Sequence, residues 1–504
     1  MTNAVSFLLD QAIADGHGGR VAIDTPEASI TYAELGELVN RTGNALREMG
    51  VEPEQRVGIL LPDGVEWVAT FLGAMRIGAV AVPLNTRLQP AEWAALLADS
   101  RARVVVADAA AAKALLDDAD RLPHLRVIAA SSSLAEVRAS VSPHAAAEPV
   151  SPDAMAFWLY TSGTTGFPKA AVHCHRDLTV GHHYGVEVLG ATSEDRVFAT
   201  SKLFFAYALG NVLAIPLTVR ARAYLAPAWP EPESVLGVLR DWRPTLFFSV
   251  PTVYARLLRA ELPRDAFAGV RHCVSAGERL PAELYTAWRE RFGAEILDGL
   301  GATETIFMVL SNRPSRSRPG SSGKPVPGSE VRLADAEGRE VADGEEGVLH
   351  VRTPSTSPFY WERIDQSRRT FLGDWFRTGD VYVRDADGYY HHRGRSDDLF
   401  KVAGMWVAPT DVETVLLAHP AVAEAGVVGV EEVSGLVKPF GFVVPKDGAA
   451  AGLVEELTAL AGKRLPSHQR PRRIVVVPEL PRTATGKLQR FRLREMVAAA
   501  NASG

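Results

Sequence analysis

Short apolar runs alternate with longer segments of helical periodicity along the first half of the chain. The run VGIL precedes VEWVATFLGAMRIG, and AVAVPL precedes AEWAALLADSRA, which leads into VVVADA. The same order returns in LFFSVPTVYARLLRA and in VRHCVSAGERLPAELYTAWRERFG. Apolar runs of this length are typical of strands buried on both faces, and the helical patterns between them supply parallel crossovers. The pattern predicts an α/β fold of mostly parallel sheets covered by helices.

The pattern changes at the stretch SNRPSRSRPGSSGKPVPG, where proline, glycine, serine and arginine predict a loop. The alternating runs EVRLAD, GVLHVRT and DVYVRDADGYYHHRG follow, with Asp-Gly turns between them, and predict a β-rich subdomain. From about Ser396 onward, strand-like AGVVGV, FGFVVP and RRIVVVP mix with helical DVETVLLAHP and LVEELTALAGKRL. We therefore expect a large N-terminal domain over residues 1–395 and a small α+β domain over residues 396–504. The segment from Ala109 to Val150 predicts surface helices and a loop.

Composition supports this division and narrows the class of protein. A chain of 504 residues is too long for one hydrophobic core. Hydrophobic residues make up 47% and charged residues 23%, which is ordinary globular composition, and the formal net charge of -6 gives no reason to expect nucleic acid or a membrane surface as partner. Two cysteines, no basic leader and no long apolar run predict a cytoplasmic protein that acts on a small molecule.

The stretch YTSGTTGFPKAAVHCH, which begins at Tyr160, resembles a phosphate loop with two positions changed. A Walker A loop requires Gly, four residues, Gly, Lys and then Ser or Thr. Counting from Gly163, Pro168 stands in place of the second glycine and Ala170 in place of the hydroxyl, whereas Lys169 is present. The glycines and hydroxyls can still surround phosphate oxygens. Alone, the stretch fits either a phosphate-binding loop or a polar surface turn.

Three other stretches carry groups that a nucleotide site needs. LDGLGATET places Asp298 in a turn before Glu304, a carboxylate of the kind that magnesium requires. WFRTGD ends a strand-like run at Asp380, which suits a ribose diol, and GRSDDLFK contains Arg395. Each group, taken singly, is better explained as a turn residue or a solvated charge.

Together, YTSGTTGFPK, GATE, WFRTGD, GRSDDLFKVAG and PRTATGK resemble the ordered signature motifs of the adenylate-forming superfamily. That superfamily includes acyl-CoA synthetases, luciferases and the adenylation domains of peptide synthetases. The resemblance covers almost the whole chain. It implies that a carboxylic acid reacts with ATP to give an acyl adenylate and pyrophosphate, and that coenzyme A then takes the acyl group and releases AMP. The implied cofactors are ATP, Mg²⁺ and coenzyme A.

The resemblance also implies roles for individual residues. The residues that would hold the β- and γ-phosphates are Thr161, Ser162, Gly163, Thr164, Thr165, Gly166 and Lys169. Those that would border the adenine and the turn before the metal ligand are Ala276, Gly277, Glu278, Asp298, Gly299 and Thr303. Glu304 would bind magnesium, and Asp380 and Arg395 would bind the ribose hydroxyls. Lys487 would reach the substrate carboxylate and the α-phosphate. The catalytic set is then Lys487, Glu304, Thr161 and Lys169.

In this superfamily the small domain rotates after adenylation and withdraws its lysine. Asp397 matches the hinge position, and Gly404 matches the glycine that lines the pantetheine tunnel, with Lys401 and Trp406 beside it.

The acid is already ionised at neutral pH, so its attack on the α-phosphorus needs no general base. The reaction instead needs the charges of the two anions to be neutralised.

SKLFFAYALGN and TETIFMVLSNRPSRSRPGSSGKPVPG are similar to the benzoate-CoA ligase subgroup, and Leu300 also fits it. The resemblance implies an acyl pocket walled by Phe205, Ala206, Tyr207, Gly301, Ala302, Ile306 and Phe307. Two positions depart from the subgroup, since Ala208 replaces a glycine and Phe307 a histidine. Phe307 in place of histidine removes a hydrogen-bonding group. This change fits an unsubstituted aryl acid, a substituted one or a bulkier biosynthetic acid as substrate, and it fits a neutral change in packing equally well.

Other interpretations stay open at this point. The acyl acceptor can be a carrier-protein thiol instead of coenzyme A, and a related chain can perform one half-reaction or act as a binding protein. A P-loop ATPase is disfavoured because Pro168 and Ala170 break its motif. The expected partners are the small-molecule acid, ATP and coenzyme A, with a homodimer left open.

Overall fold

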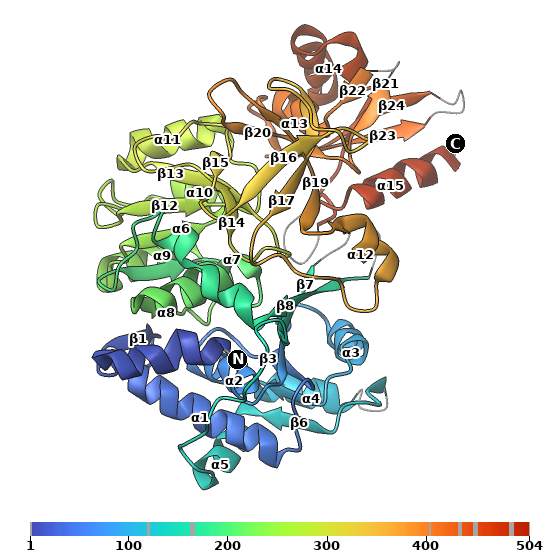
Figure 1. The fold of residues 1–504 in the computed structure, drawn as a ribbon. Helices are drawn as coiled ribbons and strands as arrows, with labels where there is room; N and C mark the ends of the chain where they lie inside the picture. Colours follow the sequence, from blue (N-terminus) through green and yellow to red (C-terminus); the bar gives the residue numbers. More distant parts are fainter. Residues whose placement is uncertain are drawn as a thin grey trace.

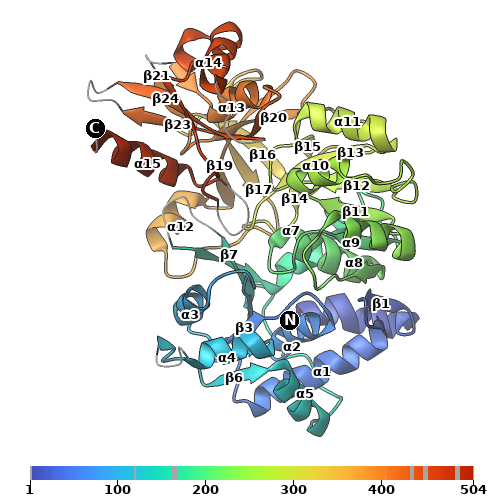
Figure 2. The same cartoon turned by 180° about the vertical axis from the view of Figure 1, so that it is seen from behind.

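The computed structural model describes residues 3–117, 121–161, 167–402, 405–431, 436–446, 452–482 and 488–502, with the backbone alone for residues 406 and 498–502. In Figure 1 the blue N-terminal part lies at the bottom, green and yellow segments lie above it, and the orange and red C-terminal part lies at the top. Figure 2 shows the same order from behind. The predicted α/β architecture with a small C-terminal unit is confirmed.

A six-stranded sheet forms the base, in the order β6-β5-β3-β4-β7-β8. Its neighbouring strands are parallel, except that β8 runs antiparallel to β7. The strands are β3 (Arg56–Leu60), β4 (Val80–Pro83), β5 (Val104–Ala107), β6 (Val127–Ala130), β7 (Met155–Thr161) and β8 (Lys169–Cys174). The helices are α1 (Tyr32–Glu48), α2 (Val65–Arg76), α3 (Pro90–Asp99), α4 (Ala109–Asp117) and α5 (Ser131–Ser140). β6 was not predicted: its short run VIAA lies between two helices, in a segment where only helices and a loop were expected.

A nine-stranded sheet lies above, in the order β15-β14-β13-β12-β11-β9-β10-β1-β2. Its strands are β1 (Val21–Asp24), β2 (Ser29–Thr31), β9 (Arg196–Ala199), β10 (Arg222–Tyr224), β11 (Leu246–Ser249), β12 (His272–Ser275), β13 (Ile296–Gly301), β14 (Met308–Ser311) and β15 (Lys324–Pro325). The helices are η1 (Ser6–Asp10), η2 (Ile13–His17), η4 (His175–Val180), α6 (His182–Gly185), α7 (Ala206–Ala208), η5 (Leu209–Ala214), α8 (Ile215–Val219), α9 (Pro232–Gly237), η6 (Val238–Trp242), α10 (Pro251–Arg259) and α11 (Ala282–Phe292).

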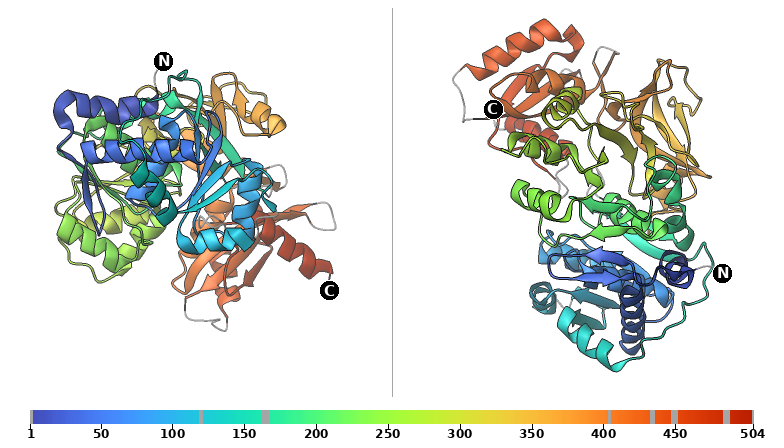
Figure 3. Two further views of the ribbon diagram at one scale, coloured as in Figure 1. Left: turned by 90° about the horizontal axis from the view of Figure 1, so that it is seen from below. Right: turned by 90° about the vertical axis from the view of Figure 1, so that its left-hand side faces the viewer.

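The two sheets share one apolar core. Ile59 of β3, Phe248 of β11 and the helices α1 and α2 contribute to it, so each sheet buries one face in this common core. A second core packs α3 and α4 on the far face of the six-stranded sheet, and a third packs α10 and α11 on the far face of the nine-stranded sheet. Burial on both faces explains why strands such as RVGIL lack polar alternation. Figure 3 shows the resulting stack of sheets and helices from two further sides.

A β-rich subdomain follows, as predicted. It is an antiparallel five-stranded sheet in the order β16-β17-β19-β18, and β20 pairs with a later part of β19 than β18 does. The elements are β16 (Glu330–Ala334), β17 (Glu346–Arg352), α12 (Ile364–Thr370), β18 (Phe371–Leu372), β19 (Trp375–Arg384) and β20 (Tyr390–Arg395). A turn over residues 396–398 then leads into the C-terminal part.

The C-terminal part has its own two apolar clusters, one on each face of a three-stranded sheet in the order β23-β24-β25. The elements are β21 (Phe400–Val402), β22 (Met405–Val407), α13 (Pro409–Leu417), β23 (Val422–Glu431), β24 (Val437–Pro445), α14 (Leu453–Arg464), η7 (Ser467–Gln469), β25 (Arg473–Val476) and α15 (Arg490–Ala502). Both cysteines, Cys174 and Cys273, are buried and free. None of the helices in the described ranges is long and apolar enough to cross a membrane.

Candidate active site

The hairpin formed by β7 and β8 places Lys169 at the mouth of the glycine-rich loop. Thr161, the last residue of β7, lies directly opposite Lys169, the first residue of β8. The loop between them, residues 162–166 (Ser162, Gly163, Thr164, Thr165 and Gly166), lies outside the described residues. A strand that leads into a loop with a lysine at its exit is therefore present, although the lysine begins a strand and not the helix that follows a Walker A loop.

Three side chains converge beside this mouth. The ammonium of Lys169 lies 3.9 Å from the ring centre of Tyr360 and 4.0 Å from Glu304 Oε1. The Tyr360 hydroxyl donates a hydrogen bond to the same Glu304 oxygen at 2.5 Å. Burial lowers the pKa of Lys169, opposed by Glu304, and further contributions come from Arg395 and Asp397. The mouth of the loop is thus a buried, charged site with one cation, one carboxylate and one phenol.

Tyr360 reaches the site because its segment pairs with β8. The Val172 N–H donates to the Phe359 carbonyl at 3.1 Å, and the Trp361 N–H donates to the Ala170 carbonyl at 3.0 Å. These bonds form a bridge between Ala171 and Tyr360. Burial raises the pKa of Tyr360, and the neighbouring Glu304 charge raises it further, so the phenol remains a hydrogen-bond donor.

His173 connects β8 to the turn that carries Glu304. Its Nδ1 lies 2.9 Å from Asp177 Oδ2, and its Nε2 lies 2.9 Å from the carbonyl oxygen of Thr303. The ring is fully buried and stacks on Phe157, with ring centres 4.9 Å apart. The position of Thr303, and with it that of Glu304, is therefore fixed relative to the strand that begins with Lys169.

The residues expected near the adenine come together at the carboxyl ends of β12 and β13. Ala276, Gly277 and Glu278 follow β12, and Asp298 on β13 pairs in register with Ser275. The Thr252 hydroxyl and N–H both donate to Glu278 Oε2, at 2.6 and 3.1 Å. Burial raises the pKa of Asp298, and Gly299 follows it along the strand. Ligand sites in parallel sheets commonly lie at this edge.

Asp380 and Arg395 form a second charged pair. They lie opposite each other on β19 and β20, and Arg395 Nη1 donates to Asp380 Oδ1 at 3.2 Å and to the Thr378 carbonyl at 2.9 Å. Gly379 has a φ of 77°, and a Cβ there would lie 3.0 Å from the Arg395 guanidinium. The glycine therefore allows the guanidinium to lie against the backbone beside Asp380.

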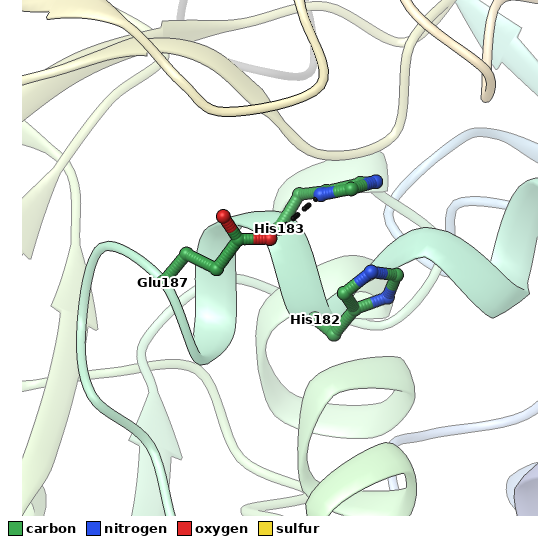
Figure 4. Close-up of side chains that lie close together, drawn as sticks. All are labelled: His182, His183 and Glu187. Carbon is green, nitrogen blue, oxygen red and sulfur yellow. Dashed lines mark hydrogen bonds and ion pairs between the residues drawn. The ribbon is translucent and has the colours of Figure 1, made fainter.

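Side chains that could bind a metal ion include Glu304 and one group of three residues elsewhere in the described part of the chain. The Glu304 carboxylate suits a hard cation such as Mg²⁺, which is usually held by one or two carboxylates and by substrate phosphates. A second group, His182, His183 and Glu187, has ligand atoms within 4.8 Å of one another, and His183 Nδ1 lies 2.9 Å from Glu187 Oε1 (Figure 4). Imidazole nitrogens suit zinc, copper or nickel, so this exposed group is no site for nucleotide-bound magnesium.

The expected acyl-site residues come from two elements of the nine-stranded sheet. Phe205, Ala206 and Tyr207 lie at the start of α7. The Tyr207 side chain is partly buried, and its hydroxyl lies 3.1 Å from both the Ser249 and Val274 carbonyl oxygens, to which it donates. Gly301 and Ala302 lie at the end of β13 and just after it.

Ile306 and Phe307 lie in a strained turn after Ala302. Ile306 has a φ of 61°, which is rare for a β-branched residue. The turn is held by the Ile306 N–H, which donates to the Ala302 carbonyl at 3.0 Å, and by the Phe307 N–H, which donates to the Thr305 carbonyl at 2.7 Å. A Cβ on Gly210 would lie 3.2 Å from the Phe307 ring, so the ring packs closely on η5. Strain of this kind is found where a side chain is held in a functional position.

A buried ion pair anchors the segment that precedes the acyl-site residues. Lys202 Nζ lies 4.0 Å from Asp63 Oδ2 and donates to the Ala226 carbonyl at 2.6 Å and to the Ala228 carbonyl. Asp63 Oδ1 accepts the Leu203 N–H at 3.1 Å. Burial raises the pKa of Asp63 to about 6, although Lys202 and the Leu203 bond lower it. The pair joins the six-stranded sheet to the acyl segment.

Replacement of Lys202 by methionine is expected to lower the free energy of unfolding by about 3 to 5 kcal/mol at pH 8, because it leaves the Asp63 carboxylate buried without its cation. Without Lys202 the pKa of Asp63 rises further. The folded state then binds a proton that the unfolded state releases, so stability lost at pH 8 is partly regained as the pH falls below that pKa. Urea unfolding at pH 8 and pH 5 measures the difference.

The double variant Lys202→Met with Asp63→Asn is the matched control, since it removes both charges. It should recover part of the lost stability at pH 8. Equal losses for Lys202→Met at pH 8 and pH 5 would contradict an ionised Asp63 in the folded protein.

The C-terminal expectations are described only in part. Asp397 lies exposed in the turn after β20, and Lys401 lies on β21 opposite Trp406 of β22, whose side chain is not described. Gly404 and Lys487 lie outside the described residues. The segment that contains Lys487 is closed by a bridge between Arg482 and Leu488.

Comparison with known families assigns the chain. The profile of the AMP-binding enzyme family matches residues 10–361, and the profile of the AMP-binding enzyme C-terminal domain matches residues 411–487. The chain belongs to the AMP-binding enzyme family. The resemblance inferred from the five motifs is therefore confirmed.

Relatives within this family act on aryl acids. The chain is 42% identical to the benzoate–CoA ligase of Thauera aromatica, over 98% of this chain and 95% of that protein. It is 41% identical to the 3-hydroxybenzoate–CoA ligase of Aromatoleum sp. (strain CIB), over 99% of this chain and 97% of that protein. The similarity extends over the full length, so both the nucleotide motifs and the acyl-site segments are included.

Solved structures share the fold. A benzoate CoA ligase from Burkholderia xenovorans LB400 superposes with a TM-score of 0.89 at 41% identity, covering 98% of this chain and all (100%) of that one. The anthranilate CoA ligase AuaEII, in complex with anthranoyl-AMP, superposes with a TM-score of 0.91 at 39% identity, covering 99% of this chain and 98% of that one.

The motifs of this AMP-binding enzyme did not point to every residue of the site. Tyr360 and His173 contact Glu304 or its turn, yet neither was predicted. Tyr360 lies in SPFYWE, a stretch outside the five motifs, and its role depends on pairing with β8. His173 lies on the buried β8 strand, where a histidine is as easily explained by packing.

Proposed function

We propose that this chain is an ATP-dependent acid–CoA ligase that acts on an aryl acid. One observation carries the proposal: Lys169 and Glu304 meet at the mouth of the glycine-rich loop, in a chain about 41% identical over nearly its whole length to ligases of aryl acids. In the first half-reaction a carboxylate and ATP give an acyl adenylate and pyrophosphate. In the second, coenzyme A and the acyl adenylate give an acyl-CoA and AMP.

The charged groups around the loop have complementary tasks in this proposal. Lys169, with the N–H groups of the loop, holds the β- and γ-phosphates. Residues 276–278 and Asp298 border the adenine, and Asp380 with Arg395 binds the ribose hydroxyls. The ribose diol can replace the bond between Arg395 and Asp380 with bonds of its own, because that bond is long at 3.2 Å.

Glu304 is the proposed ligand of Mg²⁺. Its carboxylate is buried, and its Oε1 accepts from the Tyr360 hydroxyl and lies 4.0 Å from Lys169 Nζ. The ion supplies charge neutralisation on the phosphates when it is bound. Tyr360 keeps the carboxylate in one orientation, and Lys169 balances its charge when the site holds no nucleotide.

The adenylation step needs orientation more than proton transfer. A carboxylate oxygen attacks the α-phosphorus, the bond from that phosphorus to the bridging oxygen breaks, and pyrophosphate leaves with the electron pair. Two anions must therefore be held together. Lys487 of the C-terminal part is proposed to lie between the carboxylate and the α-phosphate and to stabilise the charge that develops.

The second step is proposed to use the same small domain, residues 396–504, in another orientation. The thiol of coenzyme A loses its proton and attacks the acyl carbonyl carbon, and AMP leaves. Residues 396–398 form the turn between β20 and β21, so rotation about Asp397 would exchange Lys487 for the element containing Lys401, Gly404 and Trp406.

Asp397→Pro is expected to slow one half-reaction at least tenfold more than the other, because proline fixes φ at the hinge. The turn is held by the N–H groups of Asp398 and Leu399, which both donate to the Arg395 carbonyl at 3.0 Å, so proline at residue 397 removes neither bond. Separate assays of adenylation and thioester formation measure the two steps. Asp397→Ala, which removes the charge without fixing φ, is the control. Equal slowing of both steps by proline would count against a hinge here.

The aryl substrate and the acceptor define the finer part of the proposal. Benzoate or a ring-substituted benzoate is the proposed acid, with coenzyme A as acceptor and a carrier-protein thiol as the alternative. We also propose a protein of the cytoplasm, with a homodimer as its assembly. Acid-dependent exchange of labelled pyrophosphate into ATP tests the first half-reaction. No exchange with any aryl acid would refute the substrate class.

A further inference from the structure

Tyr184 is buried, yet its hydroxyl forms no hydrogen bond of ordinary geometry within the described part of the chain. The residue lies on α6 and is only 1% exposed. Among the residues that the structure describes, none forms a hydrogen bond of ordinary geometry with this hydroxyl, although Ser311 lies near enough to lower its pKa as a weak hydrogen-bond partner. A buried hydroxyl without a partner is costly, because folding removes its bonds to water and replaces them with nothing. Such a group in a binding region points to a ligand that completes its bonding.

The hydroxyl lies between the two elements that supply the acyl-site residues. Gly181, three residues earlier and on the same helical face, is so close to Phe307 that a Cβ there would lie 3.1 Å from the ring. Burial raises the pKa of Tyr207, and the Tyr184 phenol raises it further, so the two phenols are neighbours. On the other side lies Ser311 of β14, which stands opposite Gly299 of β13. Burial raises the pKa of Tyr184, and a weak side-chain hydrogen bond with Ser311 lowers it.

The neighbouring groups leave Tyr184 as the available polar contact. The Tyr207 hydroxyl directs its one hydrogen at two carbonyl oxygens, and the Ser311 hydroxyl donates to the Asn312 carbonyl at 2.8 Å, so neither has a hydrogen left to donate to a ligand. Phe307 offers neither a donor nor an acceptor, and Gly299 and Gly301 have no side chains. A ring substituent that reaches this side of the acyl site would meet the Tyr184 oxygen.

We propose that Tyr184 determines specificity by forming a hydrogen bond with a hydroxyl or amino substituent on the ring of the aryl acid. This proposal rests on the proposed function, because it assigns the substrate class at the same acyl site. A tyrosine hydroxyl both donates and accepts, which suits either substituent. The enzyme then prefers a hydroxybenzoate or an aminobenzoate to benzoate.

Tyr184→Phe tests the assignment through the ratio of kcat/KM for a substituted benzoate to kcat/KM for benzoate. Benzoate and the isomers of hydroxybenzoate and aminobenzoate are compared by kcat/KM, from the rate of acyl-CoA formation. We expect the preferred substituted acid to lose about tenfold, which is the effect of one neutral hydrogen bond, and benzoate to change by less than about twofold. Equal loss for both acids, or a wild-type preference for benzoate over every substituted acid, would overturn the assignment.

Tyr254→Phe is the matched control. Tyr254 is equally buried, but its hydroxyl donates to the Val274 carbonyl at 2.9 Å. Tyr254→Phe should lower the urea midpoint of unfolding and leave the ratio unchanged, whereas Tyr184→Phe should leave the midpoint unchanged or raise it. A lower midpoint for Tyr184→Phe would show that its hydroxyl is satisfied within the protein. Absence of turnover with every aryl acid would remove the proposed function, whereas turnover with an unchanged ratio would remove only the role of Tyr184.

Discussion

Replacement of Glu304 by glutamine is expected to lower acid-dependent pyrophosphate exchange by about 10²- to 10³-fold. Glutamine has the same shape, and its amide oxygen can still accept from the Tyr360 hydroxyl, so the turn should stay folded. The change removes the negative charge, which is the property that a magnesium ion requires. The loss should therefore fall on nucleotide chemistry and not on stability. Exchange measured over a range of Mg²⁺ concentrations should show a higher requirement for the ion.

A distant carboxylate provides the control for this variant. Glu66 forms an ion pair with Arg138, with oxygen and nitrogen 2.7 Å apart, and it lies on α2 away from the loop. Glu66→Gln should change the exchange rate by less than about twofold. If Glu304→Gln retained more than a third of the wild-type rate at every Mg²⁺ concentration, Glu304 would not be the metal ligand.

Lys487→Ala is expected to lower adenylation by several orders of magnitude. The reaction brings a carboxylate to a polyphosphate, and a cation between them offsets repulsion that water no longer screens. Lys487 lies outside the described residues, but its segment is fixed at both ends. Arg482 and Leu488 form a bridge, and Arg490, at the start of α15, donates to Glu413 Oε1 at 2.6 Å. The lysine therefore belongs to the C-terminal domain proposed to rotate.

The same variant should form thioester from supplied acyl adenylate at nearly the wild-type rate, because in the proposed sequence of steps the lysine withdraws before the thioester forms. Lys463→Ala, at the exposed end of α14, removes a lysine from the same domain and should affect neither step. Comparable losses in both half-reactions for Lys487→Ala would contradict its assigned role.

The fold could be predicted largely from the sequence because its strands are continuous apolar runs. VGIL, AVAVPL and VVVADA became β3, β4 and β5, since strands buried on both faces need apolar residues at every position. β6 escaped prediction because it is an edge strand among alanine-rich helices, where its run of four residues resembles the helical sequence around it.

The site could be predicted where its residues lie in local motifs. Lys169, Glu304, Asp380 and Arg395 were all expected, and the structure places Lys169 beside Glu304 and Asp380 beside Arg395. Tyr360 could not be found in this way, because its contact with Glu304 depends on strand pairing between segments almost 190 residues apart in sequence. The Tyr184 hydroxyl forms no hydrogen bond of ordinary geometry with the residues that the structure describes, and this too is a property of its surroundings, which the sequence does not specify.

The central claim is that the chain converts an aryl acid, ATP and coenzyme A into an aryl-CoA and AMP. The most direct measurement is product analysis by liquid chromatography and mass spectrometry after incubation with benzoate, hydroxybenzoates, aminobenzoates, cinnamates and larger cyclic acids. We predict equal amounts of acyl-CoA and AMP for at least one aryl acid, with no ADP. Formation of ADP, or absence of acyl-CoA with every aryl acid, would contradict the account.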